Sequence, residues 1–165
     1  MVAKKGWKVP GGGFFNYFLS IGGSMDQESI VYGCIKDATL QGSDTLRRSA
    51  NRNAMMSLPK ADEWPFLCQE MFSLPSKEGR GENYQTDVMH FGASYKAVEY
   101  EWDQWINKFE ELLSQMYWVS ATVHLETELS GTHTFTWEST ANSHEPGSGD
   151  MQVRCEWSHE GALSF

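Results

Sequence analysis

Residues 95–140, YKAVEYEWDQWINKFEELLSQMYWVSATVHLETELSGTHTFTWEST, decide the fold because the hydrophobic period changes within this stretch. Over 95–116, large apolar residues recur every three or four positions, which places them on one face of an α-helix. This apolar stripe consists of Tyr95, Val98, Trp102, Trp105, Ile106, Phe109, Leu112, Leu113 and Met116. Ser94 precedes the stripe and is a suitable N-cap. We therefore predict a long amphipathic helix, about 95–116, that covers the hydrophobic core.

After this helix the hydrophobic period becomes two. Apolar and polar residues alternate over 119–129, and the alternation resumes over 132–137, so both segments are predicted strands. Ser130 and Gly131 between them predict a two-residue hairpin turn, which sets the pairing register. In that register one face of the hairpin carries His124, Glu126, Glu128, His133, Phe135 and Trp137.

The rest of the chain gives shorter patterns. Strands are predicted over 14–21, 29–35, 84–93 and 152–157, short helices over 43–56 and 62–72, and polar loops over 76–83 and 142–150. The first two strands are close enough in sequence to form a hairpin. Strands cluster at both ends of the chain, and regular βαβ alternation is absent. We predict a single α+β domain over residues 1–165, with a largely antiparallel sheet and the long helix packed on one face.

Composition indicates a folded chain in a reducing compartment. Its 165 residues, with seven Trp, nine Phe and six Tyr, are sufficient for a core without disulfides or metal. The cysteines, Cys34, Cys68 and Cys155, are odd in number and lack metal-site spacing, so reduced thiols are expected. The sequence shows neither a signal-peptide pattern nor an apolar run of about 20 residues. We expect a soluble cytoplasmic protein with no membrane partner.

The net charge of −9 is unevenly distributed along the chain. Residues 1–60 hold eight Lys and Arg against four Asp and Glu, whereas residues 61–165 hold five against eighteen. An acidic half of this size argues against nucleic acid as a partner and favours a basic protein. The residues that we expect to contact this partner are Glu99, Asp103 and Glu110 on the helix and Phe135 and Trp137 on the hairpin.

The basic residues of the first half have a simpler explanation than a ligand. Arg47, Arg48 and Arg52 lie on the predicted helix 43–56. We expect them to neutralise the acidic second half, either within the molecule or across a homodimer.

Catalytic and cofactor motifs are missing from the sequence. The glycine clusters at 11–13 and 22–23 fit neither a P-loop nor a dinucleotide-binding pattern, and the hydrolase motifs GxSxG and HExxH do not occur. The polar cluster His124, Glu126, Glu128 and His133 has the residue types of a metal or acid–base site. A half-exposed hairpin carries such residues on its outer face in any case. No catalytic residue, metal ligand or cofactor is therefore predicted.

These observations favour a non-enzymatic acidic protein-binding module, such as an immunity or inhibitor protein that neutralises a basic toxin or nuclease. Two alternatives stay open. One is a small-ligand-binding or catalytic domain with an aromatic-lined pocket, and the other is a structural subunit of a larger, phage-derived assembly.

Overall fold

The fold is built on one antiparallel sheet. The computed structural model describes residues 27–38, 44–60, 63–73, 86–128 and 130–158. Its six strands, in the order β2-β3-β1-β4-β5-β6, are β1 (Glu28–Ala38), β2 (Phe72–Ser73), β3 (Thr86–Lys96), β4 (Ser120–Thr127), β5 (Gly131–Ser139) and β6 (Met151–Ser158). The helices are α2 (Asp44–Met56) and α3 (Trp102–Ser114), with short 3-10 turns η1 (Gln69–Met71) and η2 (Val98–Glu101). The predicted α+β class is confirmed.

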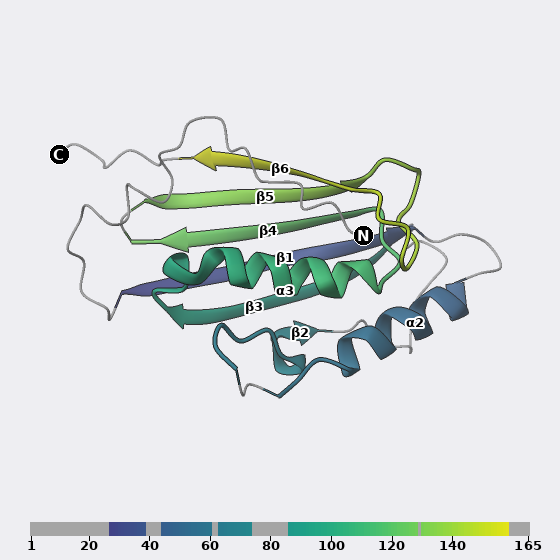
Figure 1. Ribbon diagram of the computed structural model, residues 1–165, viewed down its shortest axis with the longest axis horizontal. Coiled ribbons are helices and arrows are strands. Elements are labelled where there is room, and N and C mark those ends of the chain that lie inside the picture. The colour runs from purple at the N-terminus through teal and green to yellow at the C-terminus, as the bar shows by residue number, and fades with distance from the viewer. Residues whose placement is uncertain (1–26, 39–43, 61–62, 74–85, 129, 159–165) are drawn as a thin grey trace, which may run out of the picture.

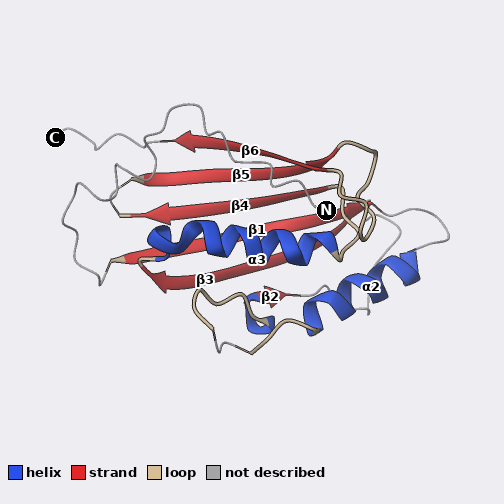
Figure 2. Cartoon of the chain, viewed as in Figure 1, coloured by secondary structure: helices blue, strands red, loops and turns tan. Residues whose placement is uncertain are grey.

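Helix α3 lies across one face of the sheet, and α2 lies beside the end that carries β2 and β3 (Figures 1 and 2). The space between α3 and the sheet is filled by aromatic side chains. Trp105, Phe109 and Trp137 are fully buried, and the ring centroid of Phe109 lies 5.2 Å from that of Trp105 and 5.1 Å from that of Trp137. Burial of each such side chain contributes about 1.5–3 kcal/mol, so this layer is the main stabilising contact of the fold.

The long helix begins later than its apolar stripe suggests. Strand β3 continues through Lys96, which pairs with Glu28 of β1, so Ser94 is not an N-cap and the predicted start at residue 95 is wrong. Ala97 then turns the chain with a left-handed φ of 50°, and η2 leads into α3. The sequence is ambiguous here because Tyr95, which is buried at the end of β3, also fits the apolar period of the helix.

Several shorter predictions can be compared with the structure. The strands predicted over 29–35, 84–93 and 152–157, the helix over 43–56 and the loop over 142–150 are confirmed within a few residues. The predicted helix over 62–72 is wrong, because this segment is irregular up to η1 and β2. Its conformation depends on contacts with distant residues, which are described below.

The predicted strand 14–21 and the predicted loop 76–83 lie outside the described residues. A hairpin between 14–21 and 29–35 is nevertheless wrong. Strand β1 pairs with β3 along one edge and with β4 along the other, so both of its edges are occupied.

Gly33 lies at the centre of β1, where the chain leaves no room for a side chain. A Cβ atom added there would lie 2.0 Å from the carbonyl oxygen of Thr122 and 2.8 Å from the ring of Phe91. The carbonyl belongs to the backbone of β4, so it moves only if the sheet is distorted. Glycine is therefore required at this position by the close approach of two strands.

We expect Gly33→Ala to lower the free energy of unfolding by about 3 kcal/mol or more, because the new methyl group overlaps the β4 backbone. Urea unfolding followed by Trp fluorescence measures the effect. Gly92→Ala in β3 is the matched control, since its nearest contact would be an ordinary 3.5 Å to the Cβ atom of Tyr32. Equal losses in the two variants would contradict the steric explanation.

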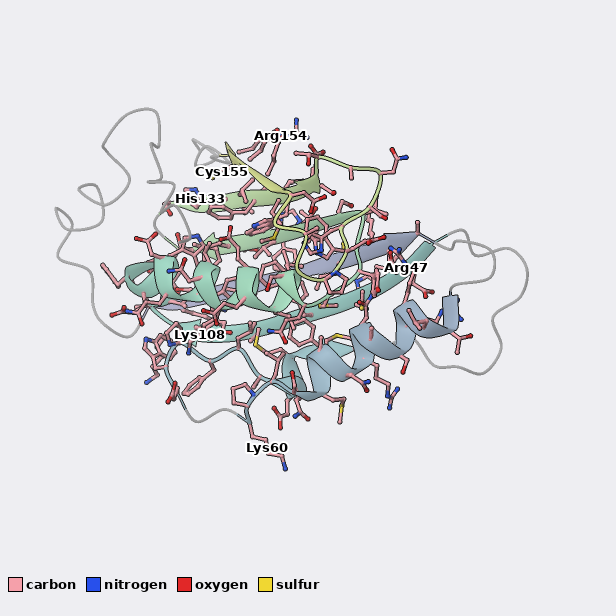
Figure 3. The ribbon with its side chains drawn as sticks, turned by 45° about the vertical axis from the view of Figure 1, so that its right-hand side comes forward. Arg47, Lys60, Lys108, His133, Arg154 and Cys155 are labelled. Carbon is pink, nitrogen blue, oxygen red and sulfur yellow. The ribbon has the colours of Figure 1, made fainter. Side chains whose placement is uncertain are left out.

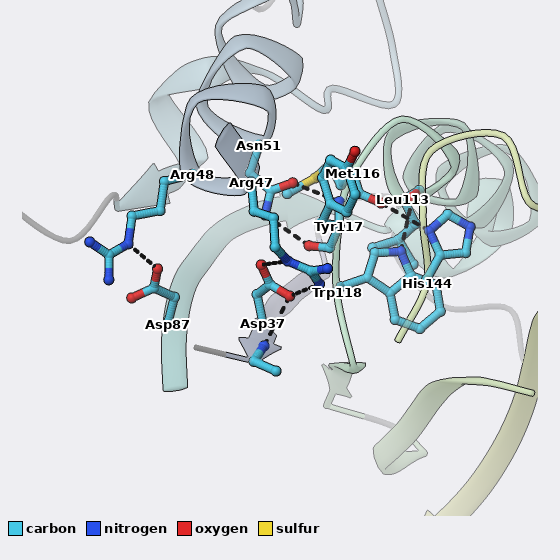
Figure 4. Close-up of polar contacts among 11 residues, drawn as sticks. Asp37, Arg47, Arg48, Asn51, Asp87, Leu113, Met116, Tyr117, Trp118 and His144 are labelled. Carbon is cyan, nitrogen blue, oxygen red and sulfur yellow. Dashed lines mark hydrogen bonds and ion pairs between the residues drawn. The ribbon is translucent and has the colours of Figure 1, made fainter. Parts of the chain in front are cut away.

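Helix α2 is attached to the sheet by a buried ion pair (Figure 4). The side chains of Arg47 and Asp37 are 5% and 4% exposed, and Arg47 Nε donates to Asp37 Oδ2 over 3.0 Å. The hydrogen bond with Asp37 raises the pKa of Arg47 above its usual value, so the guanidinium stays charged. Arg47 also lies 4.7 Å from the ring centroid of Tyr117, whose backbone N–H donates to Asn51 Oδ1 over 2.7 Å.

The expectation that the arginines neutralise the acidic second half is confirmed only for Arg48, which pairs with Asp87 of β3. Arg47 instead pairs with Asp37, which belongs to the basic first half. Arg52 takes part in no ion pair among the described residues.

Arg47→Ala is expected to destabilise the protein by about 3–5 kcal/mol, because it leaves the Asp37 carboxylate buried without its counter-charge. Arg48→Ala, the control, removes a pair whose arginine side chain is 45% exposed, and should cost about 1 kcal/mol or less. Both values come from urea unfolding at neutral pH. A loss for Arg47→Ala as small as that for Arg48→Ala would show that the pair does not anchor α2.

Candidate functional site

The predicted polar face of the β4–β5 hairpin does not form. The turn is longer than two residues, since Thr127 pairs with Gly131, and the observed pairs are Ala121 with Trp137, Val123 with Phe135, His124 with Thr134 and Leu125 with His133. Relative to the predicted register, β5 is shifted by an odd number of residues, which moves its side chains to the opposite face. The physical reason is that Phe135 and Trp137 join the core beneath α3.

The side chains of the predicted cluster therefore separate. Phe135 is 5% exposed and Trp137 is fully buried, with its indole N–H donating to Glu110 Oε1 over 2.9 Å. Their predicted role as exposed partner anchors is wrong. His124 and Glu126 lie on the face of the sheet opposite α3, where His124 stacks on Tyr32 with ring centroids 4.9 Å apart. Glu128 is an exposed turn residue.

His133 is buried at the end of the sheet beside the turn. Its Nε2 lies 2.9 Å from Ser130 Oγ, which in turn lies 2.7 Å from Thr127 Oγ1. Burial lowers the pKa of His133 from 6.5 to about 4, so the imidazole is neutral at pH 7. A Ser–His contact resembles a nucleophile–base pair, but neither residue lines the cavity described below. We interpret the contact as one that closes the β4–β5 connection.

This burial predicts a pH dependence of stability. Because the pKa of His133 is lowered in the fold, the unfolded chain binds more protons between pH 6.5 and about 4. Stability should therefore fall as the pH decreases through this window, by up to about 3 kcal/mol from this group. His133→Gln removes the titration, and the difference between variant and wild-type unfolding free energies measures it. His124→Gln is the control; a pH profile unchanged by His133→Gln would contradict the assignment.

Of the three acidic residues that were predicted to lie on the solvated face of the helix, only some are exposed. Glu99 lies in η2, is 6% exposed and accepts a hydrogen bond from Ser29 Oγ, so its assignment to the solvated face is wrong. Glu110 is half-buried against Trp137, whereas Asp103 is exposed. Of the acidic residues on or directly before α3, Asp103 and Glu111 are exposed, whereas Glu101 and Glu110 are half-buried, and Lys108 is the one Lys or Arg within α3.

A cavity of about 510 Å³ lies beside the outer edge of β3, and the sequence gives no direct sign of it. We call it the β3 groove and define it by its lining residues, Trp64, Phe66, Cys68, Met71, Ala93, Ser94, Tyr95 and Lys96. Its lining is mostly apolar. Trp64 stands over it edge-on to Phe66 and Tyr95, with ring centroids 5.4 and 5.6 Å away, and is 41% exposed.

The Tyr95 side chain connects β3 to the segment 63–71, which forms the wall of the β3 groove. Its hydroxyl donates to the carbonyl oxygen of Phe66, lies 3.2 Å from Met71 Sδ and accepts the indole N–H of Trp105 over 3.0 Å. Burial raises the pKa of Tyr95 to about 12, so the hydroxyl keeps its proton. From the other side, Lys108 Nζ donates to the carbonyl of Pro65 over 2.9 Å. The segment 63–71 is thus fixed by distant residues, which explains why no helical period specifies it.

The floor of the β3 groove is a strand edge that has no partner strand beyond β2 among the described residues. Within the described residues β2 pairs with β3 only at His90 and Phe91. Ala97 donates its backbone N–H to Gln27 over 2.8 Å, and the alternation of an antiparallel ladder then directs the N–H and C=O of Ser94 away from β1. These groups face the groove, next to the apolar wall.

Acidic residues lie close in sequence or by hydrogen bonding to the residues that line the β3 groove. Glu63 and Glu70 are exposed on the 63–71 wall, and Glu28 is exposed at the start of β1, where its carboxylate accepts the hydroxyl of Ser94 over 2.6 Å. Lys96 is the cation among the lining residues. An extended segment with an apolar side chain and basic neighbours suits such a surface.

Two further kinds of site, a metal site and a membrane-spanning helix, can be tested in the described parts of the chain. There, His, Cys, Asp and Glu side chains do not gather in groups of three that could hold a metal ion. Within the same ranges, each helix is too short or too polar to traverse a lipid bilayer.

Comparisons with known proteins identify no relative of this chain. No family model, no curated protein and no solved structure matches the chain at a significant level. The functional argument therefore depends on the geometry of this chain alone.

Proposed function

We propose that this chain is a non-enzymatic module that binds a basic protein partner and takes an extended segment of that partner into the β3 groove. The observation that carries the proposal is that a strand edge with no partner beyond β2 among the described residues lies directly beside an apolar groove. Strand addition uses the backbone for affinity and a neighbouring pocket for side-chain specificity. The β3 groove provides both elements over the same few residues.

The acidic surfaces support a basic partner over a neutral one. Glu63 and Glu70 are exposed on the segment that carries the wall of the β3 groove, and Glu28 is hydrogen-bonded to the lining residue Ser94. Glu101, Asp103, Glu110 and Glu111 lie on or directly before α3. Among the described residues, none of these seven carboxylates forms an ion pair with a cation of the chain. Carboxylates without internal counter-charges attract a basic protein and speed its association.

The biological setting is part of the same proposal. Cys34, Cys68 and Cys155 are all free thiols, which suits a reducing compartment such as the cytoplasm. A basic toxin or nuclease that the module neutralises is one partner of the required chemistry.

The test compares capture of partner proteins from native lysate by the tagged wild-type chain and by groove variants. Trp64→Ala removes the exposed aromatic wall and should weaken binding by about 30-fold or more if Trp64 is a hot spot. Leu46→Ala, a similar truncation of a residue that is 66% exposed on α2, is the matched control. The captured protein is identified by mass spectrometry and its dissociation rate is then measured with purified components.

The charge contribution is tested separately. Glu63→Lys with Glu70→Lys should slow association and reduce its salt dependence, whereas Glu126→Lys with Glu128→Lys should do so much less, because Glu126 lies on the opposite face of the sheet and Glu128 at the β4–β5 turn. The proposal is wrong if no captured protein depends on Trp64, or if both charge-reversed pairs bind with the wild-type rate.

A further inference from the structure

The opposite side of the sheet ends in a second strand edge, at β6. Within the described residues β6 pairs with β5 along its full length and with no other strand. The backbone N–H of Thr140 donates to the carbonyl of Asp150 over 3.0 Å, which fixes the alternation along this ladder. The outward-facing N–H and C=O groups therefore belong to Met151, Val153, Cys155 and Trp157.

An edge of this length is a template for pairing with another chain. Natural proteins usually protect such edges with prolines, bulges, inward-pointing charges or charged side chains, especially Lys. Strand β6 contains no proline, and its exposed charged residues have opposite signs, with Arg154 and Glu156 on either side of Cys155. Figure 3 shows Arg154 and Cys155 on β6, at the border of the sheet.

We propose that two copies of this chain associate through their β6 strands, antiparallel about a two-fold axis at Cys155, so that the two sheets become continuous. The occupant of this edge is thus a second copy. This inference concerns a different edge from the β3 groove and does not depend on the proposed function.

The charges select this register. In an antiparallel pair, residues whose N–H and C=O groups face outward must lie opposite one another. One β6 strand can therefore slide along the other only in steps of two residues. With Cys155 opposite its own copy, Arg154 lies opposite Glu156 of the second copy, twice by symmetry. The neighbouring registers place Arg154 opposite Arg154, or Glu156 opposite Glu156. Opposite charges directly across a ladder stabilise it, whereas like charges destabilise it.

The surroundings of Arg154 strengthen this pairing. Its side chain is 64% exposed and its guanidinium lies 2.6 Å from Glu138 on β5, on the same face of the sheet. In the proposed dimer each Arg154 is therefore flanked by Glu138 of its own chain and Glu156 of the second copy. The contact is a single strand pair, smaller than the roughly 1,200 Å² of most stable interfaces, so we expect a weak, concentration-dependent dimer.

Sedimentation velocity of the full chain over a wide concentration range, at moderate salt, provides the first measurement. The wild-type chain should show a reversible monomer–dimer equilibrium. Arg154→Glu and Glu156→Arg should each weaken self-association by at least tenfold, because each places like charges opposite one another. The double variant Arg154→Glu/Glu156→Arg should recover the wild-type dimer.

Mixing the two single variants gives the sharpest outcome. Arg154→Glu makes both positions acidic and Glu156→Arg makes both basic, so each chain repels itself and attracts the other. An equimolar mixture should form heterodimers, whereas each variant alone stays monomeric. Glu126→Arg on β4, far from the edge, should dimerise as the wild type does. Circular dichroism confirms that the exposed substitutions leave the fold intact.

The two-fold axis has an independent readout. In a Cys34→Ala/Cys68→Ala background, a short bis-maleimide should cross-link Cys155 to its copy, and this product should disappear in either single charge variant. Trp64→Ala should leave both dimer and cross-link unchanged, which separates this edge from the β3 groove. A wild-type chain that stays monomeric at millimolar concentration, single variants that dimerise normally, or a mixture that does not associate would each overturn the proposal.

Discussion

The layer of aromatic rings between α3 and the sheet is the contact on which the rest of the structure depends. Trp102 and Trp105 stack with ring planes 6° apart and centroids at 4.9 Å, and Phe109 continues the layer to Trp137. Burial alone does not favour one orientation of the rings, whereas stacked aromatic pairs have preferred geometries. It sets the position of α3 over the sheet and the face on which β5 presents its aromatic residues.

The hairpin register follows from this layer. Had β5 taken the register of a two-residue turn, Phe135 and Trp137 would face away from α3, and the core would lose two of its largest side chains. A longer turn is a small cost by comparison, since it changes only the connection between β4 and β5. His124 and Glu126 therefore lie on the face of the sheet opposite α3, whereas His133 lies on the face that α3 covers.

The same layer also shapes the β3 groove. Trp105 donates to the Tyr95 hydroxyl over 3.0 Å, and that hydroxyl holds the carbonyl of Phe66. The aromatic core thus extends through one hydrogen-bonded tyrosine to the wall of the groove. Because the 63–71 segment is fixed at a distance from β3, the strand edge there is left without a partner strand among the described residues.

What the sequence predicts well are the features encoded by a local period. The apolar stripe from Trp102 to Leu113 belongs to one helix and is buried as a set, and the alternation in β1, β3 and β6 marks real strands. Predictions are wrong where two local rules conflict. The turn rule for Ser130 and Gly131 opposed the alternation His133, Phe135, Trp137, which by itself indicates a buried face.

The β3 groove could not be predicted from any local period. Its wall combines Trp64 and Phe66 from an irregular segment with Tyr95 from a strand, and their proximity results from tertiary hydrogen bonds. Pro65 gives no warning either, because a proline in the first turn of the predicted helix 62–72 is compatible with a helix. The β6 edge differs in this respect, because Arg154, Cys155 and Glu156 are adjacent in sequence and need only the strand order to place them at the border.

The two edges also constrain each other. Strands lie about 4.8 Å apart, and β3 and β6 are separated by β1, β4 and β5. In a dimer joined at β6, the two β3 grooves would therefore lie about 45 Å apart across a continuous sheet, at its opposite ends. A monomeric partner would occupy these grooves independently, whereas a partner with two suitably spaced segments would gain avidity from simultaneous binding. The strand order thus separates self-association from partner binding, because neither edge covers the other.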